Sequence, residues 1–246
     1  MYRFYIEKSQ IKDEQIVITG SDVNHIKNVL RLEKGDWIVA CDNDGMDYIS
    51  RICSLGSSEV VLEIEKRQKT ESELDCQIVL FQGLPKKDKM ELIIQKAVEL
   101  GVSEIVPVEM KRCVAKLSGQ KKIDAKLSRW RAIAESAAKQ SGRGIIPKVS
   151  EPVSIQKAFE RAQELEYSMI PYELQEGMEE SRQIVAEACT KQSVGIFIGP
   201  EGGFEKEEAA DAAACGIKPI SLGKRILRTE TAGMAVLAIM MFQMQS

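Results

Sequence analysis

The fold of this 246-residue chain is decided by the stretch Val194-Gly195-Ile196-Phe197-Ile198-Gly199-Pro200-Glu201-Gly202-Gly203-Phe204. Its first five residues are apolar or glycine, which is typical of a strand buried on both faces of a parallel sheet. The next six place three glycines around a proline, so the backbone can come close to a ligand there. In open α/β sheets ligands bind beyond the carboxyl ends of the strands, which is where this loop lies.

Strands and helices alternate on both sides of this stretch. The apolar pattern predicts four further strands, at 78–81, 105–108, 167–171 and 219–222. It also predicts five helices, at 87–100, 124–141, 179–190, 206–215 and 230–244. In the first of these helices apolar residues recur at amphipathic spacing, and Gly101 follows as a C-terminal cap. Alternation of this kind predicts an α/β fold, with a mainly parallel sheet covered on both faces.

The first 66 residues are rich in β-forming residues instead. Short strands are predicted at 2–6, 15–18, 37–40, 48–52 and 59–64, with turn signals between them. One short helix is predicted at 22–30, with Ser21 or Asp22 as its N-cap. The polar run Lys66–Glu73 is the best candidate for a linker. We therefore expect a small β-barrel over 1–68 and an α/β domain over 74–246.

The composition is that of a globular protein, with 44% hydrophobic and 29% charged residues. Six widely spaced cysteines and a single histidine make a disulfide framework or a zinc site improbable, so we expect no metal. We expect no signal peptide at the start of the sequence. Its longest apolar stretch, 232–244, is shorter than the roughly 20 residues that span a bilayer. A cytoplasmic protein without a membrane partner is expected.

Charge is unevenly distributed behind the small net value of −3. Residues 111–148 contain eleven Lys and Arg against Asp124 and Glu135, whereas residues 149–211 contain five against fourteen Asp and Glu. A compact positive segment inside an acidic protein is the electrostatic footprint of phosphate contacts. A solvated helix face is the alternative interpretation.

A second unusual loop follows the strand predicted at 219–222. It runs from Leu222-Gly223 to a helix that begins at Thr229 or Glu230, with Thr229 as a candidate N-cap. Neither loop has the glycine–lysine pattern of a phosphate-binding loop or the G-x-G-x-x-G pattern of a dinucleotide site. Glu201 would repel phosphate and favour a cationic ligand such as S-adenosylmethionine (SAM). An ordinary glycine-rich turn is the alternative.

The two loops carry a resemblance to a known family. Two segments resemble the signature of the SPOUT methyltransferases: Gly199–Phe204 with Glu208, and Leu222-Gly223 with Ile226–Ala232. More narrowly, the chain resembles the RsmE type, the small-subunit ribosomal RNA uridine-N3 methyltransferases. Further matches to that type lie at His25–Arg31, Lys96–Val102 and Trp130–Arg143, and they run in family order from residue 3 to residue 233. Cys113 departs from the family, in which serine is more common there.

The resemblance implies a PUA-like, RNA-binding β-barrel followed by a SPOUT-type α/β domain with a C-terminal trefoil knot. It also implies a homodimer that forms through the knotted domain. The closing helix is rich in methionine (Met234, Met240, Met241 and Met244), which fits a dimer face. An ordinary core helix is the alternative.

The resemblance further implies a SAM site in the two loops. The adenine would be held by backbone groups of Leu222, Ile226 and Leu227 together with Gly199 and Gly202. The residues expected at the cofactor are Ile198, Gly199, Pro200, Glu201, Gly202, Leu222, Gly223, Ile226, Leu227, Arg228, Thr229 and Ala232.

The implied reaction is an in-line attack of a uridine N3 on the sulfonium methyl. The N3 proton must leave, and the single histidine lies in the other predicted domain, so the usual base is missing. Arg228 and Arg143 are candidates to stabilise the uridine anion. Glu230 is a candidate base, although a carboxylate at a helix start more often serves the helix dipole.

The predicted partner is small-subunit ribosomal RNA or the assembled small subunit. The residues expected at RNA are Arg3, His25, Arg31, Lys111, Arg112, Lys116, Lys121, Lys122, Arg129 and Arg143. A structural role is the alternative for His25. Phosphate contacts predict steep salt dependence, and an N3 target must be unpaired or flipped out.

Other classes of function stay open. One is a methyltransferase of the same superfamily that acts on another RNA such as transfer RNA. Another is a non-catalytic RNA-binding factor of ribosome assembly that keeps the knot. A nucleotide hydrolase is a distant third, because the phosphate loop and its lysine are absent from the sequence.

Overall fold

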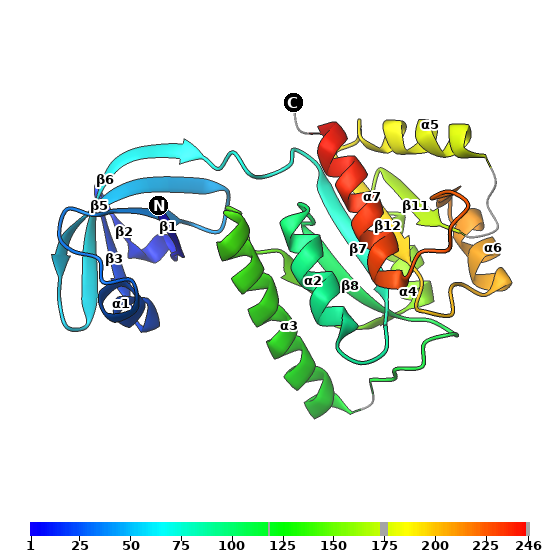
Figure 1. Cartoon of the computed structure of the whole chain (residues 1–246), viewed down its shortest axis with the longest axis horizontal. Helices are drawn as coiled ribbons and strands as arrows, with labels where there is room; N and C mark the ends of the chain where they lie inside the picture. Colours follow the sequence, from blue (N-terminus) through cyan, green and yellow to red (C-terminus); the bar gives the residue numbers. More distant parts are fainter. Residues whose placement is uncertain (118, 173–176, 245–246) are drawn as a thin grey trace. The chain divides into compact units, whose positions relative to one another are not determined.

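The computed structural model describes residues 1–117, 119–172 and 177–244 (Figure 1). The chain forms two compact units. Unit 1 comprises Met1–Glu73 together with Ala138–Ile146, and unit 2 comprises Leu74–Ala137 and Pro147–Ser246. The second segment of unit 1 comes from the end of a helix that begins in unit 2.

Unit 1 is built on a six-stranded sheet with the order β1-β4-β5-β6-β3-β2. Its strands are β1 (Tyr2–Tyr5), β2 (Ile11–Lys12), β3 (Gln15–Thr19), β4 (Trp37–Cys41), β5 (Met46–Leu55) and β6 (Glu59–Lys69). β1 pairs with β4 in parallel, and the other pairs are antiparallel. Alternate residues of the strands, such as Val60 and Leu62, are buried in one core.

The predicted helix of unit 1 is present, but its start differs. Helix α1 (Ser21–Asn24) continues into a π-helical turn at His25–Val29. Its N-cap is Gly20, with φ of +77°, and no side chain caps it, so the predicted cap at Ser21 or Asp22 is wrong. The chain enters the helix through a backbone conformation that glycine adopts without strain.

The predicted linker is partly wrong as well. Residues 66–69 belong to β6, where Lys69 pairs with Met46 of β5. Both faces of this strand end carry polar side chains, so no apolar alternation marks it in the sequence. Residues 66–69 nevertheless form strand, because the ten-residue partner strand β5 provides backbone pairing as far as Lys69.

Unit 2 contains a parallel sheet with the order β10-β8-β7-β12-β11-β13, and β9 also pairs with β8. Its strands are β7 (Gln77–Gly83), β8 (Glu104–Glu109), β9 (Lys148–Val149), β10 (Val153–Ser154), β11 (Tyr167–Pro171), β12 (Ser193–Ile198) and β13 (Lys218–Ile220). All pairs are parallel, as predicted. The stretch Val194–Ile198 is fully buried beside β7, where the rings of Phe197 and Phe81 stack 4.3 Å apart.

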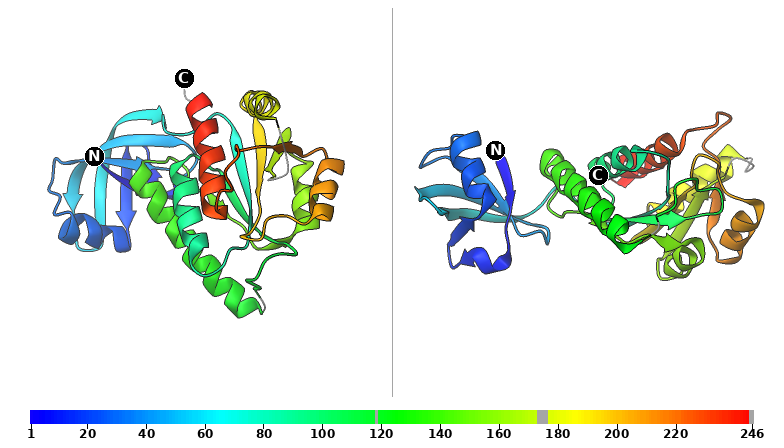
Figure 2. Two further views of the ribbon diagram at one scale, coloured as in Figure 1. Left: turned by 45° about the vertical axis from the view of Figure 1, so that its right-hand side comes forward. Right: turned by 90° about the horizontal axis from the view of Figure 1, so that it is seen from below.

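Six helices accompany this sheet in the described residues: α2 (Lys89–Glu99), α3 (Gln120–Ser141), α4 (Ile155–Ala162), α5 (Met178–Ala188), α6 (Lys206–Ala214) and α7 (Thr229–Met244). The last turn of α3 belongs to unit 1. α2 and α7 lie side by side (Figures 1 and 2). α4 was not predicted, although Ile155, Ala158, Phe159 and Ala162 bury one face of it and Ser154 caps it.

The closing helix α7 has both a core face and an exposed apolar face. Val236, Leu237 and Met240 are buried, whereas Phe242 is 81% exposed and Ile239 is also exposed. In the described part of the chain we find no helix with the length and apolar character to cross a membrane. The structure therefore confirms the coarse prediction, a sheet-rich N-terminal region followed by an α/β unit with a parallel sheet.

Candidate active site

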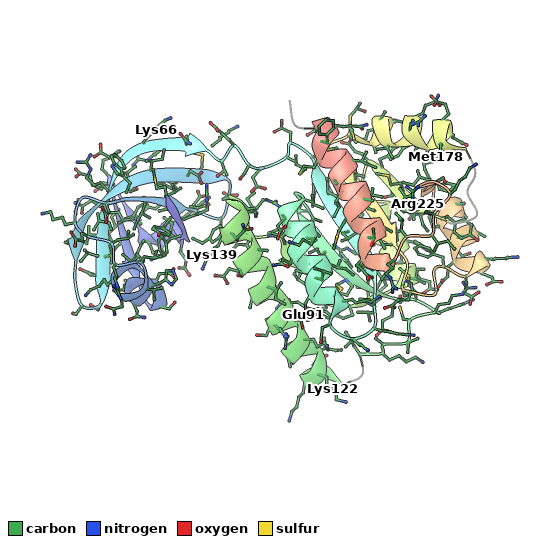
Figure 3. All side chains as sticks on the ribbon, viewed as in Figure 1. Lys66, Glu91, Lys122, Lys139, Met178 and Arg225 are labelled. Atoms are coloured by element: carbon green, nitrogen blue, oxygen red, sulfur yellow. The ribbon has the colours of Figure 1, made fainter. Side chains whose placement is uncertain are left out.

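A cavity of about 1080 Å³ lies at the carboxyl ends of three neighbouring strands of unit 2. It is lined by residues that follow β11 (Pro171, Tyr172, Gly177 and Met178), β12 (Ile198–Phe204) and β13 (Ser221–Arg228). Lys89 of α2 and Thr229 and Ala232 of α7 complete the lining. Figure 3 labels Met178 and Arg225, which belong to two of these segments. All twelve residues predicted at the cofactor line this cavity.

Glycine allows the loop after β12 to pack where it does. A Cβ atom on Gly83, at the end of β7, would lie 2.7 Å from Pro200, so no other residue fits there without movement. Gly203 has φ of +68° and donates its N–H to the Pro200 carbonyl at 2.9 Å. The loop therefore makes a tight turn pressed against the neighbouring strand end.

The loop after β13 exposes its side chains. Ile226 is 86% exposed, and Lys224, Arg225 and Arg228 are exposed as well. The start of the loop is fixed, because the Ser221 N–H donates to the Ser181 hydroxyl of α5 at 2.8 Å. An apolar side chain so exposed beside a cavity is a feature of a surface that a ligand covers.

Thr229 joins the two loops. Its hydroxyl donates to the Gly199 carbonyl at 2.6 Å and accepts from Gln82 Nε2 at 2.9 Å. Thr229 is itself the first residue of α7, so the prediction that it is the N-cap is wrong. The hydroxyl bonds to Gly199 and Gln82, in two other chain segments, and so it is not used to cap its own helix. Gln82 was not predicted, and nothing in its sequence context indicates this role.

A charged cluster borders the cavity. Lys89 Nζ lies 3.3 Å from Glu201 Oε1 and 3.1 Å from Glu230 Oε2. Burial works to raise the pKa of both carboxyl groups. Their own backbone N–H groups and Lys89 lower the pKa by more than burial raises it, so the net shift is downward. For Glu201, the Lys86 N–H adds to that lowering. A carboxylate with a lowered pKa is a poor proton acceptor, which weakens the case for Glu230 as a base.

Arg112 packs against the loop after β12. Its guanidinium donates to both carboxylate oxygens of Glu205 and, at 2.7 Å, to the Gly202 carbonyl. Glu208 is buried and accepts from the backbone N–H groups of Glu205 and Lys111. The glutamate of the family signature thus ties the basic segment to the start of α6.

Two predicted arginines are engaged inside unit 1. Arg143 is 3% exposed, and its guanidinium donates to Glu73 Oε2 at 2.6 Å. Glu73 also accepts from the Gly144 N–H at 2.7 Å. Arg3 pairs with Asp47 through its two terminal guanidinium nitrogens, Nη1 and Nη2. Arg143 is not among the residues that line the described cavity, and its predicted catalytic role stays a prediction.

The other residues predicted at RNA are exposed. His25 and Arg31 lie on unit 1, where the His25 ring meets Phe4 edge-on at 6.1 Å. Lys111, Lys116, Lys121 and Lys122 are exposed on unit 2; the last two lie in the first turn of α3, where Figure 3 labels Lys122, and the first two precede that helix in the chain. Arg129 is exposed too, although its guanidinium pairs with Glu91 at 2.7 Å.

Two family models match this chain. The model of an RNA methyltransferase domain matches residues 72–241, and the model of an RNA methyltransferase PUA domain matches residues 18–65. Both matches agree with the division of the sequence into a β-rich first part and an α/β second part.

Three similar proteins extend the comparison. The chain is 36% identical to the ribosomal RNA small subunit methyltransferase E of Bacillus subtilis, over 99% of this chain and 97% of the relative. It is 34% identical to the same enzyme of Mesomycoplasma hyopneumoniae, over 96% and 97%. The crystal structure of this enzyme from Neisseria gonorrhoeae, bound to S-adenosylmethionine, aligns with a TM-score of 0.83 at 30% identity, over 98% and 96%. The resemblance found in the sequence is confirmed, and the predicted cofactor is the ligand of the Neisseria structure.

Proposed function

Because the chain belongs to the RNA methyltransferase family, we propose that it transfers a methyl group from SAM to small-subunit ribosomal RNA. The target is N3 of one specific uridine. The observation that carries the proposal is the cavity at the ends of β11, β12 and β13, lined by the two loops that hold the family signature. The Bacillus and Neisseria relatives are named for small-subunit ribosomal RNA, which supports that substrate over transfer RNA.

The cavity fits SAM in size and chemistry. Its volume of about 1080 Å³ lies slightly above the range of about 300–1,000 Å³ that is usual for small-molecule sites, so it has room for SAM. Exposed Ile226 offers an apolar surface for the adenine, and the backbone of Gly199, Gly202, Leu222 and Leu227 can bond its polar edge. Glu201 places a negative charge on the cavity wall that favours a cationic ligand, although Lys89 Nζ, at 3.3 Å, offsets part of it. We propose that the twelve predicted cofactor residues hold the ligand.

Bound SAM supplies an electrophilic methyl group on its sulfonium. The chain must then hold the uridine in line and stabilise the charge left on the base when the N3 proton leaves. Arg228 is exposed on the cavity wall, directly before Thr229, and we assign it that stabilising role. We assign to Glu230 the role of stabilising the dipole of α7 at its N-terminus. Burial would raise the pKa of its carboxyl group, but its own backbone N–H and Lys89 lower that pKa.

We propose the finer features of the fold as well. The hydrogen bond between Thr229 and Gly199 and the packing of α7 on β12 and α2 support a chain that threads back from β13, as a trefoil knot requires. The mixed six-stranded sheet of unit 1 supports a PUA-like barrel, and we propose the two predicted domains, 1–68 and 74–246, with the first extended to Lys69, the last residue of β6. Exposed Phe242 and Ile239 on α7 support a homodimer formed through unit 2.

Mass mapping of small-subunit ribosomal RNA from a deletion strain tests the function. We expect loss of one N3-methyluridine and its return when the gene is restored. Retention of every such methylation would contradict the assigned target. Calorimetric titration of the purified protein with SAM separates an enzyme from an assembly factor that transfers nothing, because only the enzyme requires the cofactor.

A further inference from the structure

Lys89 stands at the wrong end of its helix for a cation. It is the first residue of α2, and the N-terminus of a helix carries partial positive charge that disfavours lysine. Lys96 in the last turn of the same helix follows the rule and pairs with Glu99 at 2.8 Å. A residue that breaks a local rule is commonly retained for what its side chain does elsewhere.

The Lys89 ammonium reaches two segments of the cavity wall. Glu201 lies in the loop after β12, and Glu230 lies in the first turn of α7, where the loop after β13 ends. Both carboxylates are within 3.3 Å of the one nitrogen. The Glu201 carboxylate is also held by the Lys86 N–H at 3.1 Å. Lys89 therefore joins three chain segments at the edge of the cavity.

Removal of the ammonium would leave two carboxylates close together. The side chains of Glu201 and Glu230 are 25% and 16% exposed, so water and salt screen their repulsion less than on an open surface. Other charged groups lie nearby. On the side of the loop after β13, Arg228 is close to Glu230, and Lys224 and Arg225 line the same cavity. On the side of α2, Asp88 precedes Lys89 in the chain, and Glu91 pairs with Arg129. Within the described structure none of these forms a salt bridge with Glu201 or Glu230, in contrast to Lys89.

We propose that Lys89 is a positioning residue for methyl transfer, which fixes the two cofactor loops by bridging Glu201 and Glu230. The inference rests on the proposed function, because the ligand of those loops is taken to be SAM. Lys89 acts by holding the loops in place and is not proposed to contact the methyl group or the base. Removal of Lys89 is therefore expected to weaken cofactor binding and to raise the KM for the cofactor, with little change in kcat at saturating cofactor.

The test is calorimetric titration of the full chain with SAM and with its demethylated product. For Lys89→Met we expect about tenfold weaker binding of both ligands, equivalent to about 1.4 kcal/mol. Lys89→Arg should bind as the wild type does. Lys89→Met combined with Glu230→Gln should recover most of the loss, because one of the two repelling charges is gone. Lys96→Met, on the same helix, is the matched control and should leave the affinity for both ligands unchanged.

Acidity gives an independent readout. Without the ammonium, the pKa of one of the two carboxyl groups should rise, because each disfavours ionisation of the other. As the pH falls from 8 to 5 that group takes up a proton, the repulsion ends, and the affinity of Lys89→Met should approach that of the wild type. The wild type should show a flat profile, since Lys89 and backbone N–H groups hold the pKa of both groups below its usual value against the opposing effect of burial.

Three results would overturn the proposal: equal affinity of Lys89→Met and wild type, no recovery in the double variant, or a loss that ignores pH. A drop in Tm with no recovery in the double variant would reveal a general folding role. If Lys89→Met is unstable, Glu230→Gln alone is compared with the double variant, where removal of Lys89 should cost less than tenfold. Failure of the wild type to bind SAM would overturn the proposed function itself, and so the two failures are distinguishable.

Discussion

The hydroxyl of Thr229 donates a 2.6 Å hydrogen bond to the carbonyl oxygen of Gly199, thirty residues away in the chain. This contact joins the loop after β12 to the start of α7, and both residues line the cavity. Gln82 supports it from β7, since its amide nitrogen donates to the same hydroxyl and to the Gly83 carbonyl. The side chains of Thr229 and Gln82 are both buried, so the loss of the bond between them leaves a buried amide N–H unpaired, whereas Gly199, on the other side of Thr229, is half-buried.

Thr229→Val should therefore weaken both fold and site. The valine keeps the shape but leaves the Gly199 carbonyl and one Gln82 N–H unsatisfied, which costs about 2 kcal/mol of unfolding free energy. Urea denaturation measures that cost, and titration with SAM should show weaker binding. Thr229→Ser keeps the hydroxyl and is the control. Unchanged SAM affinity in Thr229→Val would show that the bond does not shape the cofactor site.

Arg143→Ala should destabilise unit 1. Glu73 would lose a buried guanidinium partner while it still accepts from the Gly144 N–H, and breaking such a pair costs about 3 kcal/mol. Thermal unfolding measures the effect, and Glu73→Gln with Arg143→Met tests whether replacing both partners restores stability. If Arg143 instead acts in catalysis, as the sequence predicts, Arg143→Lys would keep its Tm and lose turnover.

The sequence predicted the alternation of strands and helices in unit 2 and both signature loops, because apolar runs and glycines mark them directly. It did not reveal that residues 66–69 extend β6, since both faces of that strand end are polar. The roles of Thr229 and Lys89 were missed for a different reason. Each depends on a partner far away in the chain, and a hydroxyl or an ammonium carries no sign of which distant group it bonds.

Glu104 should make unit 2 sensitive to acid. It is buried on β8, which works to raise its pKa, but the Ser150 hydroxyl and Arg161 lower it more, and the net shift is downward. A lowered folded-state pKa adds stability that is present above the unfolded value of about 4.3 and is lost as the pH falls through the folded value. We expect Glu104→Gln to cost about 2 kcal/mol at pH 7.

Urea unfolding of wild type and Glu104→Gln from pH 7 to pH 3 measures this difference. The gap between the two proteins should narrow below about pH 4, because protonated Glu104 resembles glutamine. Glu160→Gln, an exposed change on α4, is the control and should leave the unfolding free energy unchanged. A gap that stays constant with pH would show that Glu104 contributes by shape and not by charge.

Lys121 and Lys122 should contribute to RNA affinity through phosphates. Both are exposed in the first turn of α3, inside the positive segment. Their joint replacement by Ala should weaken binding to a small-subunit ribosomal RNA transcript and reduce the slope of log K against log salt by about 1 for each lysine that binds a phosphate. Lys157→Ala, an exposed lysine in the acidic segment, is the matched control. An unchanged salt slope would exclude phosphate binding at this helix start.

Arg228→Ala tests the chemical step. Arg228 is exposed on the cavity wall at the end of the loop that is proposed to hold the adenine, and we expect its guanidinium to act on a base placed beside the methyl group. Removing one preorganised charge from a developing anion lowers kcat by about a hundredfold. Single-turnover methylation of small-subunit ribosomal RNA at saturating SAM measures that step without the contribution of binding.

Arg225→Ala is the informative comparison for this variant. Arg225 lines the same cavity from the same loop, three residues earlier, so general loss of positive charge affects both variants alike. A specific role for Arg228 predicts a much larger fall in kcat for Arg228→Ala than for Arg225→Ala when each variant is measured at its own saturating SAM concentration, because Arg228 is also proposed to hold the cofactor. Equal falls would indicate that the loop attracts RNA by its net charge, and an unchanged rate in Arg228→Ala would remove Arg228 from the chemical step.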